Sequence, residues 1–264
     1  MEVKVGAIKI PKKLKRRFRE IRLTLVRAGW RYCPVCETRS RRFATHGVDP
    51  REGARCDHCL SLERHRLVWL YFKERTDLFD GREKAVLHVA PEIIFQPLLL
   101  ERLGRGYLSA DLASPRAMVK MDITDIQYPD DAFDVIYCSH VLEHVPDDHK
   151  AMRELHRVLK PDGWAILLVP IREKVTQEDL SITDPEERTR LYGQHDHVRQ
   201  YGADYVDRLR AAGFTVNVTR SKELYSAAER IRMGLLGQSI YYCTKEGGAG
   251  LAEPGPRDHA SRHR

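Results

Sequence analysis

The chain has 264 residues, 42% of them hydrophobic and 31% charged, which is enough for one sizeable globular domain and a smaller one. No apolar run reaches the roughly 18 residues that span a bilayer, and the basic N-terminus lacks the apolar core of a secretory signal, so a cytoplasmic protein is expected. The net charge of +7 is concentrated, because Lys9 to Arg22 holds eight Lys or Arg residues and one Glu.

Residues 1–29 are predicted to form a basic amphipathic helix. One interpretation is a helix packed on the body of the protein with a solvated basic face. The other is a helix that lies on an anionic surface, either a membrane contacted through residues 9–27 or a nucleic-acid backbone. The apolar face carries Leu14, Phe18, Ile21 and Leu25, and the opposite face carries Lys12, Lys13, Arg16, Arg19 and Arg22.

Residues 30–60 contain two Cys-x-x-Cys turns, Cys33–Cys36 and Cys56–Cys59, separated by nineteen residues. Four thiolates at this spacing are typical of a structural Zn²⁺ site. Disulfides are disfavoured because nothing indicates an oxidising compartment, and a redox pair would need a thioredoxin-like context that is absent. We therefore expect a zinc-ribbon-like module with Zn²⁺ on Cys33, Cys36, Cys56 and Cys59, which would lower the net charge to about +5.

A connecting helix is expected over residues 61–80. Its start, SLERHR, is expected to be a solvated helix face, with contact to the main domain or to an acceptor as the alternative. The tail over 246–264 is rich in Gly, Pro and charged residues, so it is expected to be disordered.

Residues 81–245 alternate between predicted strands and helices. Strands are expected at 84–90, 106–110, 118–122, 133–138, 163–169, 214–219 and 239–244, and helices at 92–103, 147–159 and 200–212. This alternation predicts an α/β fold with a Rossmann-like, doubly wound and mostly parallel sheet. Ligands of such sheets bind beyond the carboxyl ends of the strands, so the loops after Ala90, Ala110, Met121 and Tyr137 should converge.

The segments AVLHVA, YLSAD, VKMDIT, FDVIYCSHVLEHVPDD and KPDGW follow one another in this region. In that order they resemble the class I S-adenosylmethionine-dependent methyltransferases of the type 11-like branch, in which the fourth strand runs into a Leu-Glu-His-Val segment. The resemblance covers roughly residues 84–245. It implies S-adenosyl-L-methionine as cofactor and methyl transfer as the reaction.

The resemblance also implies roles for the strand ends. Asp111 would accept hydrogen bonds from the ribose diol, Asp122 would lie near the adenine amino group, and Glu92 could meet the ammonium group of the cofactor. Either Asp could instead be a turn or cap residue. The first loop lacks the usual glycines, so Ala90 is expected to permit the close approach. The expected cofactor-binding residues are His88, Ala90, Pro91, Glu92, Asp111, Leu112, Asp122, Ile123, Cys138 and Ser139.

Residues 192–202, YGQHDHVRQYG, are expected to hang over the same crevice. A histidine oriented by an Asp can remove a proton from an acceptor hydroxyl. The alternatives are a polar loop that caps the next helix, structural His–Asp pairs, or a second metal site. The preceding segment, ITDPEERTRLYG, is predicted to be a lid on the acceptor side. The catalytic candidates are His195, His197, Asp196 and His140, and the substrate-binding candidates are Tyr192, Arg199 and Glu143.

The leading functional hypothesis is methyl transfer to a hydroxyl or amine of a small molecule or glycan. A second is an RNA methyltransferase that holds RNA with the zinc ribbon and the basic helix. A third is a non-catalytic zinc-binding scaffold with a degenerate methyltransferase fold.

Overall fold

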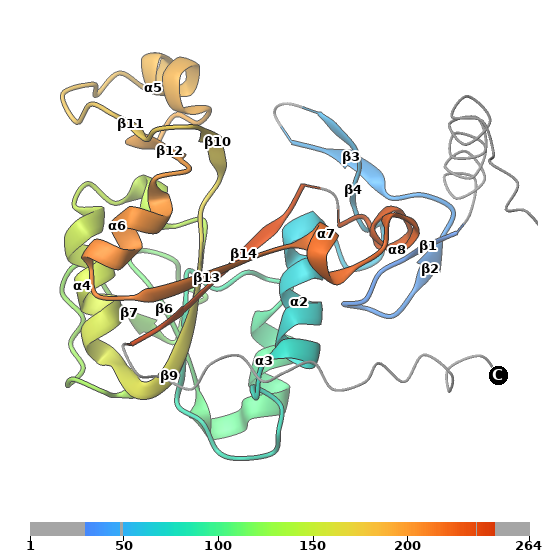
Figure 1. The fold of residues 1–264 in the computed structure, drawn as a ribbon, viewed down its shortest axis with the longest axis horizontal. Helices are drawn as coiled ribbons and strands as arrows, with labels where there is room; N and C mark the ends of the chain where they lie inside the picture. Colours follow the sequence, from blue (N-terminus) through green and yellow to red (C-terminus); the bar gives the residue numbers. More distant parts are fainter. Residues whose placement is uncertain (1–29, 48–49, 236, 246–264) are drawn as a thin grey trace, which may run out of the picture. The chain divides into compact units, whose positions relative to one another are not determined.

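The computed structural model describes residues 30–47, 50–235 and 237–245, and Figure 1 shows its fold. The predicted basic helix over 1–29 and the predicted tail over 246–264 lie outside these residues. Within the described ranges, none of the helices has the length and apolar character needed to cross a membrane. The chain divides into two compact units, the first made of the residues up to Leu67 with Ser221–Gln238, the second of Val68–Arg220 with the residues from Ser239.

Among the described residues, the first unit is built from two short hairpins, two complete helices and the beginning of a third. Strand β1 (Arg31–Tyr32) pairs antiparallel with β2 (Arg39–Ser40), and β3 (Ala44–His46) pairs antiparallel with β4 (Arg51–Arg55). Helix α2 (Glu63–Arg75) begins in this unit and continues into the second. Helices α7 (Ser221–Leu224) and α8 (Ala227–Met233) join the first unit from the far end of the sequence.

Arg66 connects these distant segments within the first unit. Its guanidinium is fully buried and donates to the carbonyl oxygens of Met233 at 2.7 Å and Gly234 at 2.9 Å, and also to those of Ser61 and Ala54. The predicted solvated face at SLERHR is therefore wrong for Arg66. The sequence predicted one continuous domain over 81–245, but residues 221–238 belong to the zinc-ribbon unit because their backbone carbonyls satisfy this buried cation.

The second unit contains a seven-stranded sheet in the order β13-β14-β9-β8-β5-β6-β7. Neighbouring strands are parallel except β14, which runs antiparallel to both β13 and β9. This arrangement confirms the predicted doubly wound, mostly parallel sheet. The strands are β5 (Val86–Val89), β6 (Tyr107–Asp111), β7 (Val119–Lys120), β8 (Phe133–Ser139), β9 (Leu159–Leu168), β13 (Thr215–Arg220) and β14 (Ser239–Thr244).

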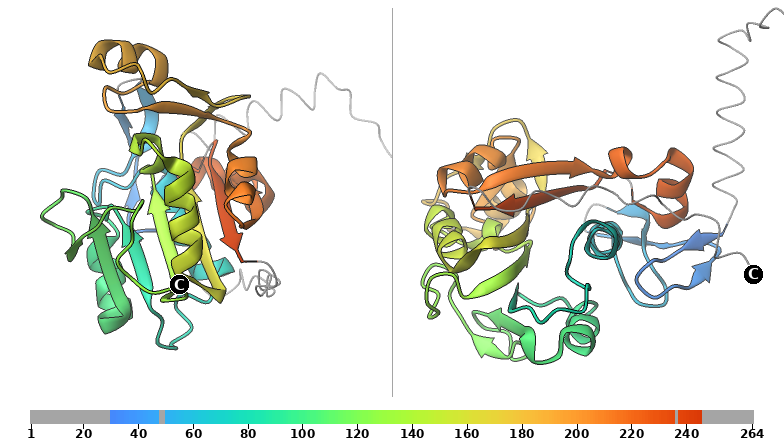
Figure 2. Two further views of the ribbon diagram at one scale, coloured as in Figure 1. Left: turned by 90° about the vertical axis from the view of Figure 1, so that its left-hand side faces the viewer. Right: turned by 60° about the horizontal axis from the view of Figure 1, so that its bottom comes forward.

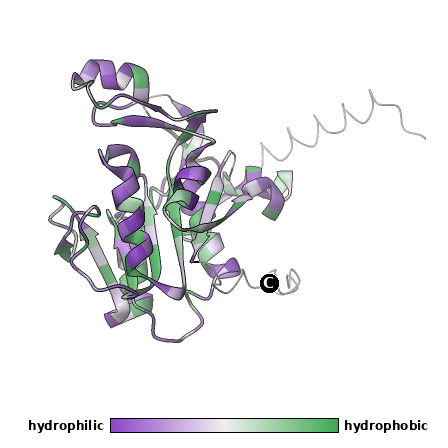
Figure 3. Cartoon of the chain, turned by 60° about the vertical axis from the view of Figure 1, so that its left-hand side comes forward, coloured by the Kyte–Doolittle hydropathy of each residue, from purple (hydrophilic) through white to green (hydrophobic). Residues whose placement is uncertain are grey.

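Side-chain alternation along β5 and β8 gives the sheet two buried faces. Leu87 and Ile136 are paired neighbours whose side chains enter a core that also contains residues of α4 (Asp148–Val158) and α6 (Tyr205–Ala211). The next residues along the strands, His88 and Tyr137, face the other way, and Tyr137 contacts Phe95 just before α3 (Gln96–Leu103). Figure 2 shows α4 along the sheet, and Figure 3 shows that the central strands are largely hydrophobic.

Residues 171–202 form a small subdomain after β9. Its strands are β10 (Ile171–Glu173), β11 (Gln177–Glu178) and β12 (Arg199–Gly202), in the order β10-β12-β11, with α5 (Pro185–Tyr192) between β11 and β12. The predicted helix over 200–212 is wrong at its start, because 199–202 is a strand and α6 begins at Tyr205. Gly202 permits this pairing, since a Cβ there would lie 2.4 Å from the carbonyl carbon of Val175.

Candidate functional site

The strand order reverses between β5 and β8, so a crevice is expected beyond the ends of these two strands. The residue after each strand has a left-handed backbone, with φ of 48° at Ala90 and 57° at His140. The amide of Ala90 donates to Ala110 on one side, and that of His140 donates to Leu168 on the other, both at 2.8 Å. The backbone after β5 therefore turns toward β6, and the backbone after β8 turns toward β9. Both turns use a strained left-handed residue at the edge of the expected crevice.

The first loop carries a carboxylate that is held in place by the sheet. His88 is fully buried, and its Nε2 lies 2.6 Å from Glu92 Oε2 while its Nδ1 lies 2.8 Å from the Tyr107 hydroxyl. Tyr137 donates its hydroxyl to the other oxygen, Glu92 Oε1, at 2.9 Å. His88 thus anchors Glu92 from the sheet, and Pro91 separates the turn at Ala90 from Glu92.

The second loop follows β6 at Asp111. Its Oδ1 accepts the amides of Ala113 at 2.8 Å and Ser114 at 2.7 Å, which fixes the turn. Within the described part of the chain, Asp111 Oδ2 accepts no hydrogen bond, so one oxygen is available to a ligand. The neighbouring Leu112 is exposed.

The third loop is more exposed than the second. Asp122 Oδ1 accepts the amide and the hydroxyl of Thr124, both at 2.8 Å, in a local turn. Ile123 is buried in the hydrophobic core instead of facing outward, so it supports the loop from below. The sequence placed Asp122 and Ile123 side by side at the cofactor, whereas the structure turns them in different directions.

The fourth strand ends in two buried polar side chains. Cys138 lies in the core between the sheet and α4, and burial raises the pKa of its thiol. Ser139 Oγ is also buried, and it makes no hydrogen bond with any residue that the structure describes. Buried hydroxyl groups usually have a hydrogen-bond partner, so Ser139 Oγ is a candidate to bind a polar ligand next to the switch in strand order.

A cluster of ionisable side chains lies directly after β8. The short helix η2 (Leu142–His144) places Glu143 Oε1 3.2 Å from His140 Nδ1. His144 Nδ1 lies 3.2 Å from Asp196 Oδ2, and the rings of His144 and His197 meet edge to face at 4.7 Å. The structure thus brings together four residues predicted from the sequence, His140, Glu143, Asp196 and His197, and adds His144 to them.

The two predicted histidines of the 192–202 segment differ in their surroundings. His197 is buried, and its Nδ1 lies 3.0 Å from the carbonyl oxygen of Tyr192. Burial lowers the pKa of His197, so the imidazole is neutral near pH 7. His195 is exposed to solvent.

Two residues that the sequence predicted to bind substrate form hydrogen bonds within the protein. Arg199 is almost completely buried and donates to the carbonyl oxygens of Leu142, Val145 and Pro146, and it also pairs with Glu178. Tyr192 accepts the amide of Asp179 with its hydroxyl at 3.0 Å. Arg199 therefore differs from the prediction: its donors are used to join η2 to the 171–202 subdomain.

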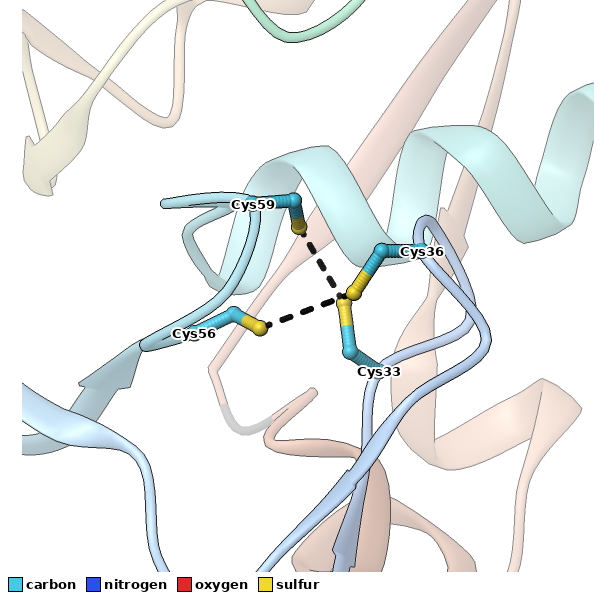
Figure 4. Close-up of side chains that lie close together, drawn as sticks. All are labelled: Cys33, Cys36, Cys56 and Cys59. Atoms are coloured by element: carbon cyan, nitrogen blue, oxygen red, sulfur yellow. Dashed lines mark hydrogen bonds between the residues drawn. The ribbon is translucent and has the colours of Figure 1, made fainter.

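In the first unit, the four predicted metal ligands lie together with their sulfur atoms pointing toward one another (Figure 4). Cys33 Sγ is 3.6 Å from Cys59 Sγ, and Cys36 Sγ is 3.8 Å from Cys56 Sγ. These separations are far longer than the ~2.05 Å of a disulfide bond. A tetrahedral cation at about 2.3 Å from each sulfur would require sulfur–sulfur distances of about 3.8 Å, so the cluster fits such an ion.

The two Cys-x-x-Cys turns repeat the same backbone design. Cys33 donates its amide to Thr38, and Cys56 donates its amide to Ser61. The residue after each turn has a left-handed backbone, with φ of 56° at Glu37 and 63° at Leu60. The hydrogen bond with Cys59, followed by burial, raises the pKa of Cys33 to about 12, so a bound cation is needed to keep all four sulfurs as thiolates.

Comparison with known proteins gives partial matches to methyltransferases. The family described as "Methyltransferase domain" matches residues 104–167. Ajmaline N-methyltransferase from Rauvolfia serpentina is 34% identical over 103 residues, which are 39% of this chain and 33% of that protein. Ubiquinone/menaquinone biosynthesis C-methyltransferase UbiE from Vibrio campbellii is 44% identical over 50 residues, 19% of each protein.

The chain spans a third or less of the length of these curated relatives. Among solved structures, 1,6-didemethyltoxoflavin-N1-methyltransferase from Burkholderia thailandensis, with bound 1,6-didemethyltoxoflavin and S-adenosylhomocysteine, is 17% identical with a TM-score of 0.45, covering 76% of this chain and 98% of that one. The matched family segment runs from the residue after α3 through β6, β7, β8 and α4 into β9, so it includes the ends of β6 and β8 but not β5 or the loop that follows it. Over residues 104–167 the chain therefore matches the methyltransferase-domain family, and over part of its length it is similar to known methyltransferases.

Proposed function

We propose that the chain is an S-adenosylmethionine-dependent methyltransferase that transfers a methyl group to a hydroxyl or amine of a small molecule or glycan. The observation that carries this proposal is the pair of unused polar atoms at the switch in strand order. Within the described residues, Asp111 Oδ2 and Ser139 Oγ have no hydrogen-bond partner, and they are the last residues of β6 and β8, the two strands that flank β5. The residues present therefore fit a polar nucleoside ligand.

The first loop supports the same conclusion. Glycine is usual here because a left-handed turn costs little without a Cβ. Ala90 adopts that conformation nonetheless, so the turn forms without the glycine. Glu92, held by His88 and Tyr137, supplies a fixed negative charge for the ammonium group of the cofactor.

In this proposal Asp111 binds the ribose hydroxyls with its free oxygen, and Asp122 lies toward the adenine. The bound cofactor supplies an electrophilic methyl group that an aligned nucleophile can take in line. His140 is the proposed base, because its side chain is partly exposed while Nδ1 faces Glu143, which leaves Nε2 for the acceptor. A carboxylate this close to an imidazole stabilises its protonated form by charge attraction.

The acceptor class rests on the chemistry of this cluster and on the relatives. The names of two relatives refer to ajmaline and to ubiquinone or menaquinone biosynthesis. Both concern small organic molecules, and this supports a small acceptor over a macromolecule. The RNA alternative relies on the zinc ribbon together with the basic segment over 1–29, and that segment lies outside the described residues.

We further propose that the four cysteines of the first unit bind a structural Zn²⁺ ion. Four thiolates close the coordination shell, so no position remains for a catalytic water. A Zn²⁺ ion with four thiolates carries a net charge of −2. The buried guanidinium of Arg66 carries the opposite charge. Desolvation lowers the pKa of Arg66, and the negative charges of nearby groups raise it; these groups are Cys33, Glu63, Cys56 and Cys59.

Calorimetry with S-adenosylmethionine and S-adenosylhomocysteine tests the main proposal. Asp111→Asn keeps Oδ1 for the turn but replaces the free oxygen with an amide, so affinity should fall at least about tenfold, as expected for a hydrogen bond to a charged group worth about 1.5–3 kcal/mol. Asp125→Asn, a change at an exposed carboxylate, should leave affinity unchanged. Wild-type protein that binds neither compound would favour the non-catalytic scaffold.

A further inference from the structure

A second group of metal-ligating side chains belongs to the second unit of the chain. Glu143, His144 and His197 each present one ligand atom, and these atoms all lie within 4.8 Å of one another. We propose that Glu143, His144 and His197 bind a divalent transition-metal ion, and that this ion holds an oxygen atom of the methyl acceptor. The second half of this proposal rests on the methyltransferase function proposed above, whereas the first half does not.

The strongest indication is the carboxylate of Glu143. Its side chain is only 1% exposed, and neither oxygen makes a hydrogen bond with any residue in the described ranges. His140 Nδ1 is 3.2 Å from Oε1 but makes no hydrogen bond with it, so both oxygens remain without a hydrogen-bond partner among the described residues. A buried carboxylate without compensation costs several kcal/mol, and a bound cation removes that cost.

The two histidines have the outer contacts that metal-binding histidines require. His197 Nδ1 lies against the carbonyl oxygen of Tyr192, and His144 Nδ1 lies against the carboxylate of Asp196. Each contact favours a proton on Nδ1 and leaves Nε2 as the free donor atom. Partners of this kind fix the tautomer and the ring orientation of metal ligands.

The backbone around the cluster is rigid. Val198 donates its amide to the carbonyl oxygen of Glu143 at 2.9 Å, and Arg199 donates to that of Leu142 at 2.8 Å. These bonds fix η2 against β12, so the elements that carry the three ligands are held together before any ion binds. This explains why Arg199 is buried in a position where the sequence suggested a substrate contact.

The ligand set indicates the chemistry of the ion. Two imidazoles and one carboxylate suit Zn²⁺, Mn²⁺ or Fe²⁺ and leave coordination positions open. Metal–ligand bonds of about 2.1 Å place neighbouring ligand atoms about 3.4 Å apart, so separations that are within 4.8 Å would shorten by at most about 1.4 Å on binding. The partly exposed His144 can provide this movement. An acceptor with a hydroxyl or carboxylate oxygen would fill an open position and be oriented beside the crevice.

Zinc stoichiometry tests the site on the full-length protein. The protein is stripped of weakly bound metal, dialysed against buffered Zn²⁺ and analysed by elemental mass spectrometry. We expect about two zinc ions per chain in the wild type, one at the cysteines and one at this site. Glu143→Gln and His144→Gln should each retain about one, and the exposed control His149→Gln should retain two.

A positioning role for Asp196 has its own readout. Asp196→Asn should weaken Zn²⁺ binding at this site by about 10–100-fold in calorimetry, as expected when an outer partner of a ligand is removed. His144 is partly exposed, so the thermal unfolding temperature of His144→Gln should stay close to that of the wild type. The loss of a zinc ion in this variant would then not be caused by unfolding. One zinc per chain in the wild type and in every variant would overturn the proposed metal site.

These results separate the two proposals. Asp111→Asn should lose cofactor affinity and keep both zinc ions, whereas Glu143→Gln should keep cofactor affinity and lose one zinc ion. If the wild type held two zinc ions but did not bind the cofactor, the metal site would be supported and the methyltransferase function contradicted. If no variant changed the number of zinc ions and cofactor binding was normal, the metal site would be contradicted and the methyltransferase function would stand.

Discussion

Nε2 of the fully buried His88 lies 2.6 Å from the carboxylate of Glu92, which binds the turn after β5 to the sheet beneath it. Tyr137 on the adjacent strand β8 holds the second oxygen of the same carboxylate. The first loop therefore depends on side chains from both strands that border the crevice. Glycine content alone would have given an incomplete description of how this loop is formed.

Removing one of these contacts should weaken cofactor binding. Tyr137→Phe deletes a hydrogen bond to a carboxylate, worth about 1.5–3 kcal/mol, without creating a cavity. We expect about a tenfold or larger loss of S-adenosylhomocysteine affinity in calorimetry. Tyr128→Phe, another aromatic residue of this domain, should bind as the wild type does. Equal affinities in all three proteins would show that Glu92 does not contact the cofactor.

Arg199 should be critical for folding of the methyltransferase domain. Arg199→Gln removes a buried cation from three carbonyl oxygens and from Glu178, leaving those groups unpaired. Breaking such an interaction typically costs about 3–5 kcal/mol. Urea unfolding should detect this loss, while Arg210→Gln at an exposed ion pair should change stability by less than about 1 kcal/mol. A small effect at Arg199 would contradict its structural role.

Chelation of the structural metal should loosen two separated segments together. The cysteines and Arg66 belong to one unit with α7 and α8, and the contact from Arg66 to Met233 joins residues 167 positions apart. Hydrogen exchange after treatment with a strong chelator should speed up in residues 31–67 and in 227–233. Exchange in β8 and β9 should stay slow. Loss of protection confined to residues 31–67 would argue against a shared unit.

The turn after the second cysteine pair should be improved by glycine. Leu60 is 54% exposed and has a φ of 63°, so its side chain contributes little burial while its backbone conformation costs about 1–2 kcal/mol. Leu60→Gly should slow metal release to a chelator or leave it unchanged, and the β-branched Leu60→Val should accelerate it. Faster release from Leu60→Gly than from Leu60→Val would contradict this account.

The fold was predictable because its signals are local. Buried strands such as those containing Leu87 and Ile136 appear as apolar runs, and their order along the chain is that of a doubly wound sheet. The four cysteines were also found from their spacing, since each pair lies in a single short turn. In contrast, the strand over 199–202 was mistaken for the start of a helix, because its pairing with β10 and β11 depends on distant backbone.

The sequence by itself determined the class of the fold, the identities of the cysteine cluster and the strand ends where the site lies, because these features depend on composition and short spacings. Only the tertiary structure decided which polar residues face one another. It buried Arg66 and Arg199 among backbone carbonyls, joined residues 221–238 to the first unit, and placed His144 and His197 beside the unpaired carboxylate of Glu143. Burial and pairing of charges depend on contacts between distant segments, and a linear pattern does not contain those contacts.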